Sequence, residues 1–210
     1  MISDYSDSFI MNLLKGQLSF FKIDDRELEQ IRNIYPVVKS RVEYNFSHST
    51  NKYYWKNNQV YFSPFQSSQY TIFLYYLSNT LFKENSYKNR EICDKIYYLN
   101  RMLNSCDLFY EVNLPDIFFL DHPLGSVIGR GKFGNYFSFS QGCTIGNNKG
   151  FYPQLGEKVS MLSNSKIIGN SRIGNNVIVA ANTYIKDTDI PNNSLVFGVS
   201  PNLVVKDNKL

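Results

Sequence analysis

One of the two histidines in the chain stands where an imidazole could transfer protons. His122 follows Asp121 and precedes Pro123, whereas His48 lies in a polar Ser-His-Ser-Thr segment and is expected at the surface. An imidazole has an unperturbed pKa of about 6.5, so it can take a proton from a hydroxyl group near neutral pH. Taken alone, a histidine beside a proline is more simply explained as a solvated turn residue. The elements around His122 must therefore decide between a general base and a turn.

The other residue types that often carry chemistry point away from metal or thiol catalysis. Two distant histidines do not supply the three that a three-histidine zinc site requires, so we predict no metal site. The three cysteines, Cys93, Cys106 and Cys143, have neither CxxC spacing nor an even count. We therefore expect reduced thiols rather than a disulfide framework. Cys143 has no histidine close to it in sequence that would form a thiolate pair, so we expect it to be a small structural residue.

A repeat of six residues organises the second half of the chain. Apolar side chains fall at perfect six-residue intervals at Leu155, Met161, Ile167, Ile173, Val179 and Ile185. The same interval joins Phe133, Phe139 and Ile145 upstream, and Ile128 misses it by one residue. Neither the 3.6-residue period of a helix nor the two-residue period of a strand produces such a repeat. A three-sided coil with inward-stacked side chains does, so we predict a parallel β-helix.

The repeat is interrupted between Ile145 and Leu155. We predict that residues 146–153 form a loop extruded from a corner of the coil, and such interruptions often carry function in repeat proteins. Asparagine pairs can supply the positive-φ conformations that tight corners need. These pairs are Asn147-Asn148, Asn175-Asn176 and Asn192-Asn193.

The first half of the chain has helical periodicity instead. A first helix should begin at the acidic pair Asp24-Asp25, and Pro36 is expected to kink or end it. Its apolar stripe is Leu28, Ile31, Ile34 and Val38. Ser67 or Ser68 should cap a second helix, and a third carries Ile92, Ile96, Leu99 and Leu103. We therefore predict an α+β chain with a mainly α-helical N-terminal domain over residues 1–108 and a β-helix domain over residues 109–210.

The composition limits the class of partner. Hydrophobic residues make up 43% and charged residues 19% of the 210 residues, which is typical of a globular protein. The net charge of +4 comes from scattered basic residues, so we predict no nucleic-acid partner. The N-terminus carries acids where a signal peptide carries basic residues, and no apolar run approaches the roughly 20 residues that cross a bilayer. We therefore expect a cytoplasmic protein without an integral membrane segment.

Taken together, these motifs resemble the hexapeptide-repeat acyltransferases, in particular the serine acetyltransferases and their relatives that modify surface polysaccharides. The stretches that carry the resemblance are Leu120-Asp121-His122-Pro123, Gln141-Gly142-Cys143-Thr144-Ile145-Gly146, Tyr152-Pro153-Gln154-Leu155-Gly156, Ile168-Gly169 with Ile173-Gly174, and Phe197-Gly198-Val199-Ser200-Pro201. The resemblance implies a left-handed β-helix preceded by helices, acetyl-CoA as the acyl donor, and a homotrimer whose helical halves can join two trimers.

The resemblance also implies roles for individual residues. His122 takes the place of the base that deprotonates the acceptor hydroxyl, and Asp121 the place of an acid that contacts the acceptor. Serine enzymes have an arginine and a second histidine where this chain has Phe151 and Tyr152, which we expect to line the acceptor site. Asn113 stands where an acid usually orients the base, and we expect it to bind the substrate together with Phe151 and Tyr152. The candidates to replace that acid are Asp116 and Glu111.

Acetyl-CoA is implied to lie in a groove along the coil, between adjacent subunits. Its predicted contacts in this chain are Gly146, Ser163, Ala181, Lys186 and Gly198. Lys158 and Lys206 are further candidates for contacts with its phosphates. Backbone N–H groups of residues 146–150 are candidates to hold the oxyanion that forms during acyl transfer.

Three functions remain open at this point. The leading hypothesis is O-acetylation of a sugar in a surface polysaccharide or its precursor, because an aromatic pair at positions 151 and 152 stacks on a pyranose ring better than it binds a carboxylate. The alternative is a serine O-acetyltransferase of cysteine biosynthesis, which the resemblance also allows. The third is a β-helix scaffold without catalysis, in which His122 is only a turn residue.

Overall fold

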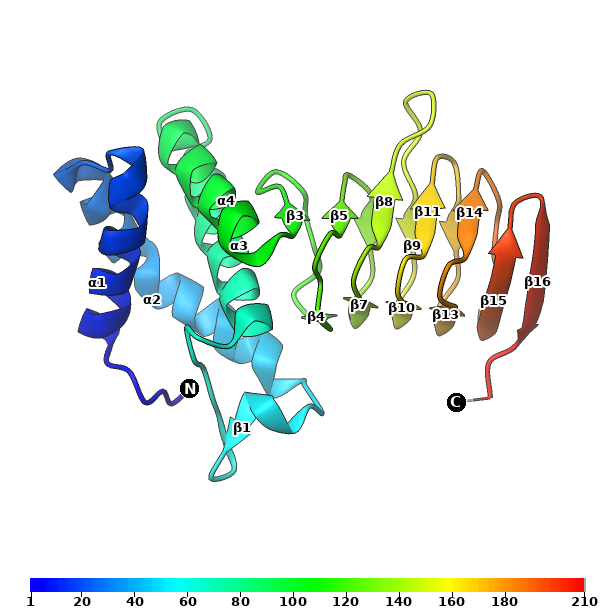
Figure 1. Ribbon diagram of the computed structural model, residues 1–210, viewed down its shortest axis with the longest axis horizontal. Helices are drawn as coiled ribbons and strands as arrows, with labels where there is room; N and C mark the ends of the chain where they lie inside the picture. Colours follow the sequence, from blue (N-terminus) through cyan, green and yellow to red (C-terminus); the bar gives the residue numbers. More distant parts are fainter. Residues whose placement is uncertain (210) are drawn as a thin grey trace. The chain divides into compact units, whose positions relative to one another are not determined.

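The computed structural model of the protein describes residues 1–209 and divides the chain into two compact units. The first unit is Met1–Asn104 and the second begins at Ser105. The sequence analysis predicts this division slightly later, between residues 108 and 109. Figure 1 shows α-helices in the first unit and a stack of short strands in the second. The predicted fold class, a helical region followed by a parallel β-helix, is confirmed.

The first unit is built from α-helices with a short antiparallel pair of strands. The helices are α1 (Asp7–Leu18), α2 (Asp25–Ser47), α3 (Ser67–Glu84) and α4 (Arg90–Asn104), with 3-10 turns η1 (Ser19–Phe21) and η2 (Lys52–Tyr54) and strands β1 (Trp55–Lys56) and β2 (Gln59–Val60). The sequence analysis does not single out α1. Helix α2 begins as predicted at the acidic pair, where Asp24 and Glu27 form a reciprocal capping box.

Three local predictions in this unit are revised: the cap of α3 is wrong, Pro36 does not end its helix, and His48 lies only partly at the surface. Pro36 does not end α2, which continues to Ser47; its buried stripe extends to Val42 and Phe46, and this packing offsets the roughly 3 kcal/mol that an interior proline costs. The N-cap of α3 is Gln66 rather than Ser67 or Ser68, because the Gln66 side chain accepts the N–H of Gln69. His48 is half-buried, and its Nδ1 lies 2.8 Å from the carbonyl oxygen of Tyr44.

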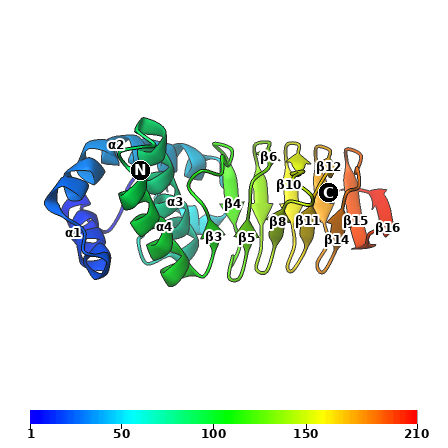
Figure 2. The same ribbon diagram turned by 90° about the horizontal axis from the view of Figure 1, so that it is seen from above.

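The second unit is a three-sided parallel β-helix (Figure 2). The first face consists of β4 (Phe118–Leu120), β7 (Phe137–Phe139), β10 (Val159–Met161), β13 (Val177–Val179) and the start of β15 (Ser194–Val199). The second face consists of β3 (Asp107–Leu108), β5 (Val127–Ile128), β8 (Thr144–Gly146), β11 (Lys166–Ile168) and β14 (Tyr184–Lys186). The third face consists of β6 (Lys132–Phe133), β9 (Gln154–Leu155) and β12 (Arg172–Ile173).

The side chains of the six-residue repeat stack inside this coil as predicted. Ile145, Ile167 and Ile185 pair in register on the second face, and each is at most 1% exposed. Ile128 pairs with Ile145 despite its offset of one residue, because five residues rather than six separate Ile128 from Phe133 on the next face. The half-buried Phe133 lies at the edge of the stack, 5.0 Å from the Phe137 ring.

We call the turn from the first to the second face the first corner, the next turn the second corner, and the turn back to the first face the third corner. Asn176 and Asn193 have positive φ of 55° and 54° at the third corner, as predicted. In the extruded loop at the second corner, the positive φ angles belong to Lys149 and Gly150 rather than to Asn147 or Asn148. The C-terminal strand β16 (Asn202–Asp207) pairs antiparallel with β15.

Candidate functional site

His122 lies at the first corner, between β4 and β5. Its backbone adopts a left-handed conformation with φ of 48°, and its carbonyl oxygen accepts the N–H of Leu124 at 2.8 Å. The preceding Asp121 is fixed to the next coil, since its N–H donates to the carbonyl of Phe139 at 3.0 Å. The His122 side chain is 87% exposed. A rigid corner therefore holds an imidazole that projects into solvent.

Asp121 is the carboxylate nearest to this imidazole. Its Oδ1 lies 3.9 Å from Nε2 of His122, which is longer than a hydrogen bond, and no other carboxylate among residues 1–209 comes within 4.0 Å of the ring. Glu111, one candidate for the orienting acid, instead forms an ion pair with Arg130 at 3.0 Å. Asp116, the other candidate, and Asn113 are exposed in the segment that precedes the first coil. In the part of one chain that the structure describes, no acid is therefore hydrogen-bonded to His122.

Several residues predicted to bind acetyl-CoA follow His122 along the first corner. Successive coils are joined there by backbone hydrogen bonds, including Gly142 to Leu124, Asn164 to Gln141 and Asn182 to Ser163. Ser163 and Ala181 thus stack in one column with Gln141, and Ala181 is exposed. Gly198 continues the column in β15, which begins on the first face and reaches the second face where Val199 pairs with Tyr184. The column leaves the backbone open because its side chains are small.

An apolar strip that the sequence analysis missed runs beside this column. Leu162 is 42% exposed and Phe197 is 37% exposed. They occupy equivalent positions two coils apart, each directly after a paired strand residue (Met161 with Val179, and Val179 with Val196). Lys206 of β16 places its Nζ 5.9 Å from the centroid of the Phe197 ring. This lysine, a predicted phosphate contact, therefore lies near the C-terminal end of the column. The sequence could have indicated Leu162 and Phe197 only if the six-residue repeats had been aligned with one another at this corner.

The predicted loop is present at the second corner. It projects between β8 and β9, where Figure 1 shows it extending beyond the strands. Asn148 and Phe151 exchange backbone hydrogen bonds of 3.1 and 3.0 Å, and the Asn148 amide donates to Asp187 at 2.6 Å. The N–H of Asn148 is therefore occupied and does not serve as an oxyanion donor. Phe151 and Tyr152 are exposed, at 57% and 40%.

The structure separates the predicted site residues into two groups within one chain. The first corner carries His122, Asp121, Ser163, Ala181 and Gly198. The second corner carries Gly146, Phe151, Tyr152 and Lys186, since Gly146 and Lys186 both pair with Ile168. Lys158 lies at the third corner, where its N–H donates to Asn135. The two groups therefore lie at different corners of the coil in one chain.

The second corner also carries Arg130, which the sequence analysis did not consider. It occupies the turn between β5 and β6, on the same coil as His122. Its Nη2 donates to Oε2 of Glu111 at 3.0 Å, and its guanidinium carbon lies 5.9 Å from the centroid of the Phe109 ring. No periodic pattern in the sequence marks this arginine, so its position became visible only through the fold.

The cysteines are placed as structural residues. Cys143 is fully buried inside the coil, with its Sγ 3.3 Å from the carbonyl oxygen of Leu162. Burial, assisted by the charge of Asp107, raises the pKa of Cys106 to about 12. Burial also raises the pKa of Cys93 to about 12. Such thiols remain protonated near neutral pH and do not act as nucleophiles.

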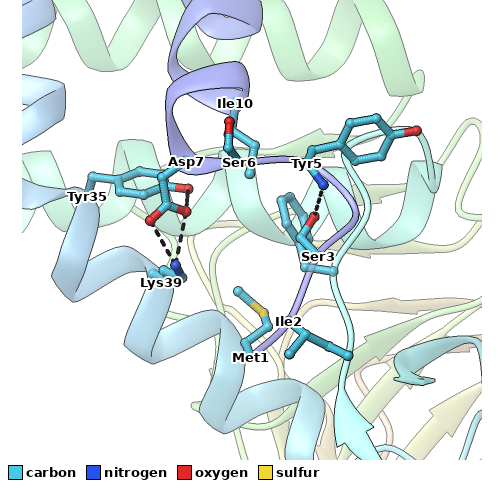
Figure 3. Close-up of a pocket in the computed structure, with 10 residues that line it drawn as sticks. Met1, Ile2, Ser3, Tyr5, Ser6, Asp7, Ile10, Tyr35 and Lys39 are labelled. Atoms are coloured by element: carbon cyan, nitrogen blue, oxygen red, sulfur yellow. Dashed lines mark hydrogen bonds and ion pairs between the residues drawn. The ribbon is translucent and has the colours of Figure 1, made fainter. Parts of the chain in front are cut away.

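A hollow of about 250 Å³ lies in the first unit rather than at either corner. Figure 3 shows Asp7, Tyr35 and Lys39 together at its wall, where the Asp7 carboxylate accepts hydrogen bonds of 3.0 Å from Tyr35 and 2.9 Å from Lys39. Burial and then the Asp7 charge raise the pKa of Tyr35. The charged side chains of Asp7 and Lys39 are therefore paired with each other, and we assign no reaction or ligand to this hollow.

Comparison with known proteins was made against family models, sequences and solved structures. No family model matches the chain. The chain is similar to the serine acetyltransferase of Staphylococcus epidermidis, at 29% identity over 130 residues, which cover 59% of this chain and 61% of that protein. It is also similar to the serine acetyltransferase of Staphylococcus xylosus, at 23% identity over 145 residues, covering 67% and 65%. The matched stretch thus spans less than two thirds of either relative.

Solved structures of serine acetyltransferases share the fold. That of Neisseria gonorrhoeae has a TM-score of 0.75 at 22% identity and covers 97% of this chain and 80% of that chain. A serine acetyltransferase in complex with CoA has a TM-score of 0.66 at 15% identity, covering 86% and 74%. The Neisseria gonorrhoeae protein in complex with serine also has a TM-score of 0.66, at 20% identity, covering 83% and 72%. Within residues 1–209, none of the helices has the length and apolar character needed to span a bilayer.

Proposed function

We propose that the chain is an acetyl-CoA-dependent O-acetyltransferase in which His122 is the general base. The observation that carries this proposal is the exposed imidazole at the start of a column of small residues, Ser163, Ala181 and Gly198, on one corner of the coil. An extended thioester can lie along such a column because Gly198 has no side chain and Ala181 has only a methyl group. The names of the sequence relatives, all serine acetyltransferases, support the same class of reaction.

The chemistry asks little of the protein beyond a base and a binding surface. Bound acetyl-CoA supplies a thioester, whose sulfur is a good leaving group. His122 takes the proton of the acceptor hydroxyl as the hydroxyl oxygen forms its bond to the acetyl carbon. The imidazolium then returns a proton to the sulfur as the carbon–sulfur bond breaks. Asp121, 3.9 Å from the ring, is exposed enough to contact the acceptor.

A homotrimer explains why the site residues lie at two corners. In a closed three-fold ring around an axis parallel to the coil, the first corner of one chain faces the second corner of the next. His122 and the column of small residues then lie opposite Phe151, Tyr152 and Lys186 of a neighbouring copy. This assembly completes a groove for acetyl-CoA and its acceptor without any change in the chain.

L-serine is the acceptor that the relatives favour. They bear the name serine acetyltransferase, and one structure with the same fold was solved in complex with serine. A sugar of a surface polysaccharide or its precursor is the second candidate. It is supported by Phe151 and Tyr152, two exposed aromatic side chains on the extruded loop that can stack on a pyranose ring.

Release of free thiol from acetyl-CoA tests the proposal. With L-serine as the acceptor we expect thiol release that His122→Ala reduces by about 10²- to 10⁴-fold, the usual contribution of a general base. His48→Gln is the matched control and should leave the rate unchanged, because His48 lies in the helical unit. Turnover on a hexose derivative but not on L-serine would select the sugar. Absence of turnover with either, in a folded trimer, would favour the non-catalytic scaffold.

A further inference from the structure

The third face of the coil carries a row of polar side chains on its outer surface. Lys132 of β6, Gln154 of β9 and Arg172 of β12 pair in register, so their side chains leave the face one above another on successive coils. We call these three residues the basic row. All three are exposed, and within residues 1–209 none of their side chains forms a hydrogen bond or an ion pair. Figure 2 shows β6 and β12 along one side of the coil.

The geometry of the coil sets the spacing of the basic row. Neighbouring parallel strands lie about 4.8 Å apart, so Lys132 and Arg172, two coils apart, are separated by roughly 10 Å along the coil axis. The Gln154 amide lies between the two cations and can both donate and accept hydrogen bonds. The basic row is therefore complementary to an extended chain that carries negative charges at intervals and hydrogen-bonding groups between them.

A strip of bare backbone runs beside the basic row. Gly134, Gly156 and Gly174 form it, and each follows the inward residue of its strand. A Cβ on Gly134 would lie 2.5 Å from the carbonyl oxygen of Gly156, and one on Gly156 would lie 2.9 Å from that of Gly174. The coils are too close here to admit a side chain. A flat ligand that contacts the basic row can therefore also lie against the backbone.

The basic row ends in an open hollow of about 510 Å³, lined by residues that include Arg172, Asp189 and Asn192. Oδ1 of Asp189 accepts the backbone N–H of Arg172 at 3.0 Å, and Oδ1 of Asn192 accepts that of Asn175 at 2.7 Å. No other residue in the described part of the chain bonds to Oδ2 of Asp189 or to the amide nitrogen of Asn192. The hollow thus offers an acceptor, neutral donors and a guanidinium together.

This mixture of groups favours a saccharide over other anionic chains. Sugar hydroxyl groups both donate and accept, so one sugar can bind the Asp189 carboxylate and the Asn192 amide at the same time. A chain of phosphates has few donors to offer Asp189 and is repelled by its charge. Nucleic acid carries a phosphate at every nucleotide, which a row with two cations and a neighbouring acid matches poorly.

We propose that the third face binds an extended acidic polysaccharide. Carboxylates of the polymer pair with Lys132 and Arg172, its rings lie along the glycine strip, and its hydroxyl groups enter the hollow at the end of the row. In the proposed three-fold ring the first and second corners meet, which leaves the third corner and the third face beside it on the outside. The polysaccharide site is separate from His122 and does not depend on acetyl transfer.

Calorimetry on the full-length protein tests this proposal. The probes are an oligogalacturonate and its full methyl ester, which keeps the rings and most hydroxyl groups but carries no charge. We expect the acid to bind about 10-fold more tightly than the ester, because each charge-assisted pair adds to the affinity. The difference should shrink as the salt concentration rises, since the cations are exposed.

Substitutions in the basic row locate the site. Arg172→Gln and Lys132→Gln each remove one cation and should weaken oligogalacturonate binding about 3- to 10-fold. Gln154→Glu places a negative charge between the cations and should weaken it about 10-fold or more. The matched control is Arg26→Gln, because Arg26 is an exposed arginine of α2 in the first unit. It should leave the affinity unchanged, and thermal unfolding shows whether each variant remains folded.

The outcomes separate this proposal from the acetyltransferase function. Equal affinity for the acid and its methyl ester overturns the proposal, and so does binding that Arg172→Gln and Gln154→Glu leave unchanged. Tighter binding of polyphosphate or single-stranded DNA through the same row assigns it a different polyanion and also overturns the proposal. Because binding is measured without acetyl-CoA, a protein that fails to release thiol can still bind the saccharide, and the reverse result leaves the proposed reaction intact.

Discussion

Gly142 is the position at the first corner where the structure predicts the clearest effect of a single methyl group. Its φ is +66°, a conformation that L-residues with a Cβ adopt at a cost of about 1–2 kcal/mol. A Cβ there would also lie 2.1 Å from Oδ1 of Asn164, the residue that stacks on Gly142 in the next coil. Gly142→Ala therefore combines backbone strain with a steric clash.

The two contributions can be given magnitudes. Asn164 is exposed, so its amide can rotate away from the new methyl group, and a displaced rotamer costs about 0.5–1.5 kcal/mol. We therefore expect Gly142→Ala to lower the free energy of unfolding by about 2–3 kcal/mol in total. For a chain of this size that corresponds to a fall in Tm of roughly 4–12 °C.

Two further variants separate strain from clash. Gly150 has φ of +84° and no heavy atom within 4 Å of an added Cβ, so Gly150→Ala should show only the backbone cost of about 1–2 kcal/mol. In the double variant Gly142→Ala/Asn164→Gly the clash is absent, and a double-mutant cycle measured by urea unfolding should give a coupling of about 1 kcal/mol. Equal stabilities of Gly142→Ala and wild type, or a coupling near zero, would refute the reasoning about this corner.

Three other predictions follow from the same structure. Ile167 is fully buried, so Ile167→Ala should cost about 2–5 kcal/mol in urea unfolding, and an equal loss from the half-exposed Ile178→Ala would contradict the inward stack. Burial raises the pKa of Cys93 and Cys106 to about 12, so both thiols should react with thiol reagents only after unfolding, and rapid labelling of the native protein would contradict their burial. Because the same thiols ionise near about pH 8.5 in the unfolded chain, the free energy of unfolding should fall as the pH rises from there towards 12. Asn148→Ala removes the side-chain hydrogen bond to Asp187 that anchors the extruded loop, and it should raise the KM for the acceptor about threefold to tenfold with little change in Tm; an unchanged KM would contradict a role of the loop in acceptor binding.

The fold was predictable where the sequence is periodic. Six-residue spacing identified the inward residues from Leu155 to Ile185, because a coil with equal sides gives every inward residue the same interval. The six-residue spacing fails where a side or turn of the coil changes length. Ile128 pairs in register with Ile145 although it lies one residue away from the expected interval. In the helical unit, Pro36 was given too much weight, because local propensity does not record the buried contacts on both sides of it.

The candidate site was predictable residue by residue but not as an arrangement. Family resemblance selected His122 and the small residues of the first corner, and the phase of the repeat separates them from Phe151 and Tyr152 at the second corner. The sequence analysis did not identify Arg130, because its contacts depend on a turn and on Glu111, 19 residues earlier, and neither has a periodic signal in the sequence. Neither sequence candidate for the acid that orients His122, Glu111 or Asp116, lies within 4.0 Å of its ring in the described part of the chain.

The geometry of the coil also constrains how the activity can depend on assembly. The three corners of one coil point in different directions, and His122 lies at a different corner from the extruded loop. In the proposed three-fold ring, rotation about an axis parallel to the coil carries the second corner of one copy to the first corner of the next. The six-residue repeat then does more than build the core, because it sets the two halves of the proposed site at matching heights along the coil.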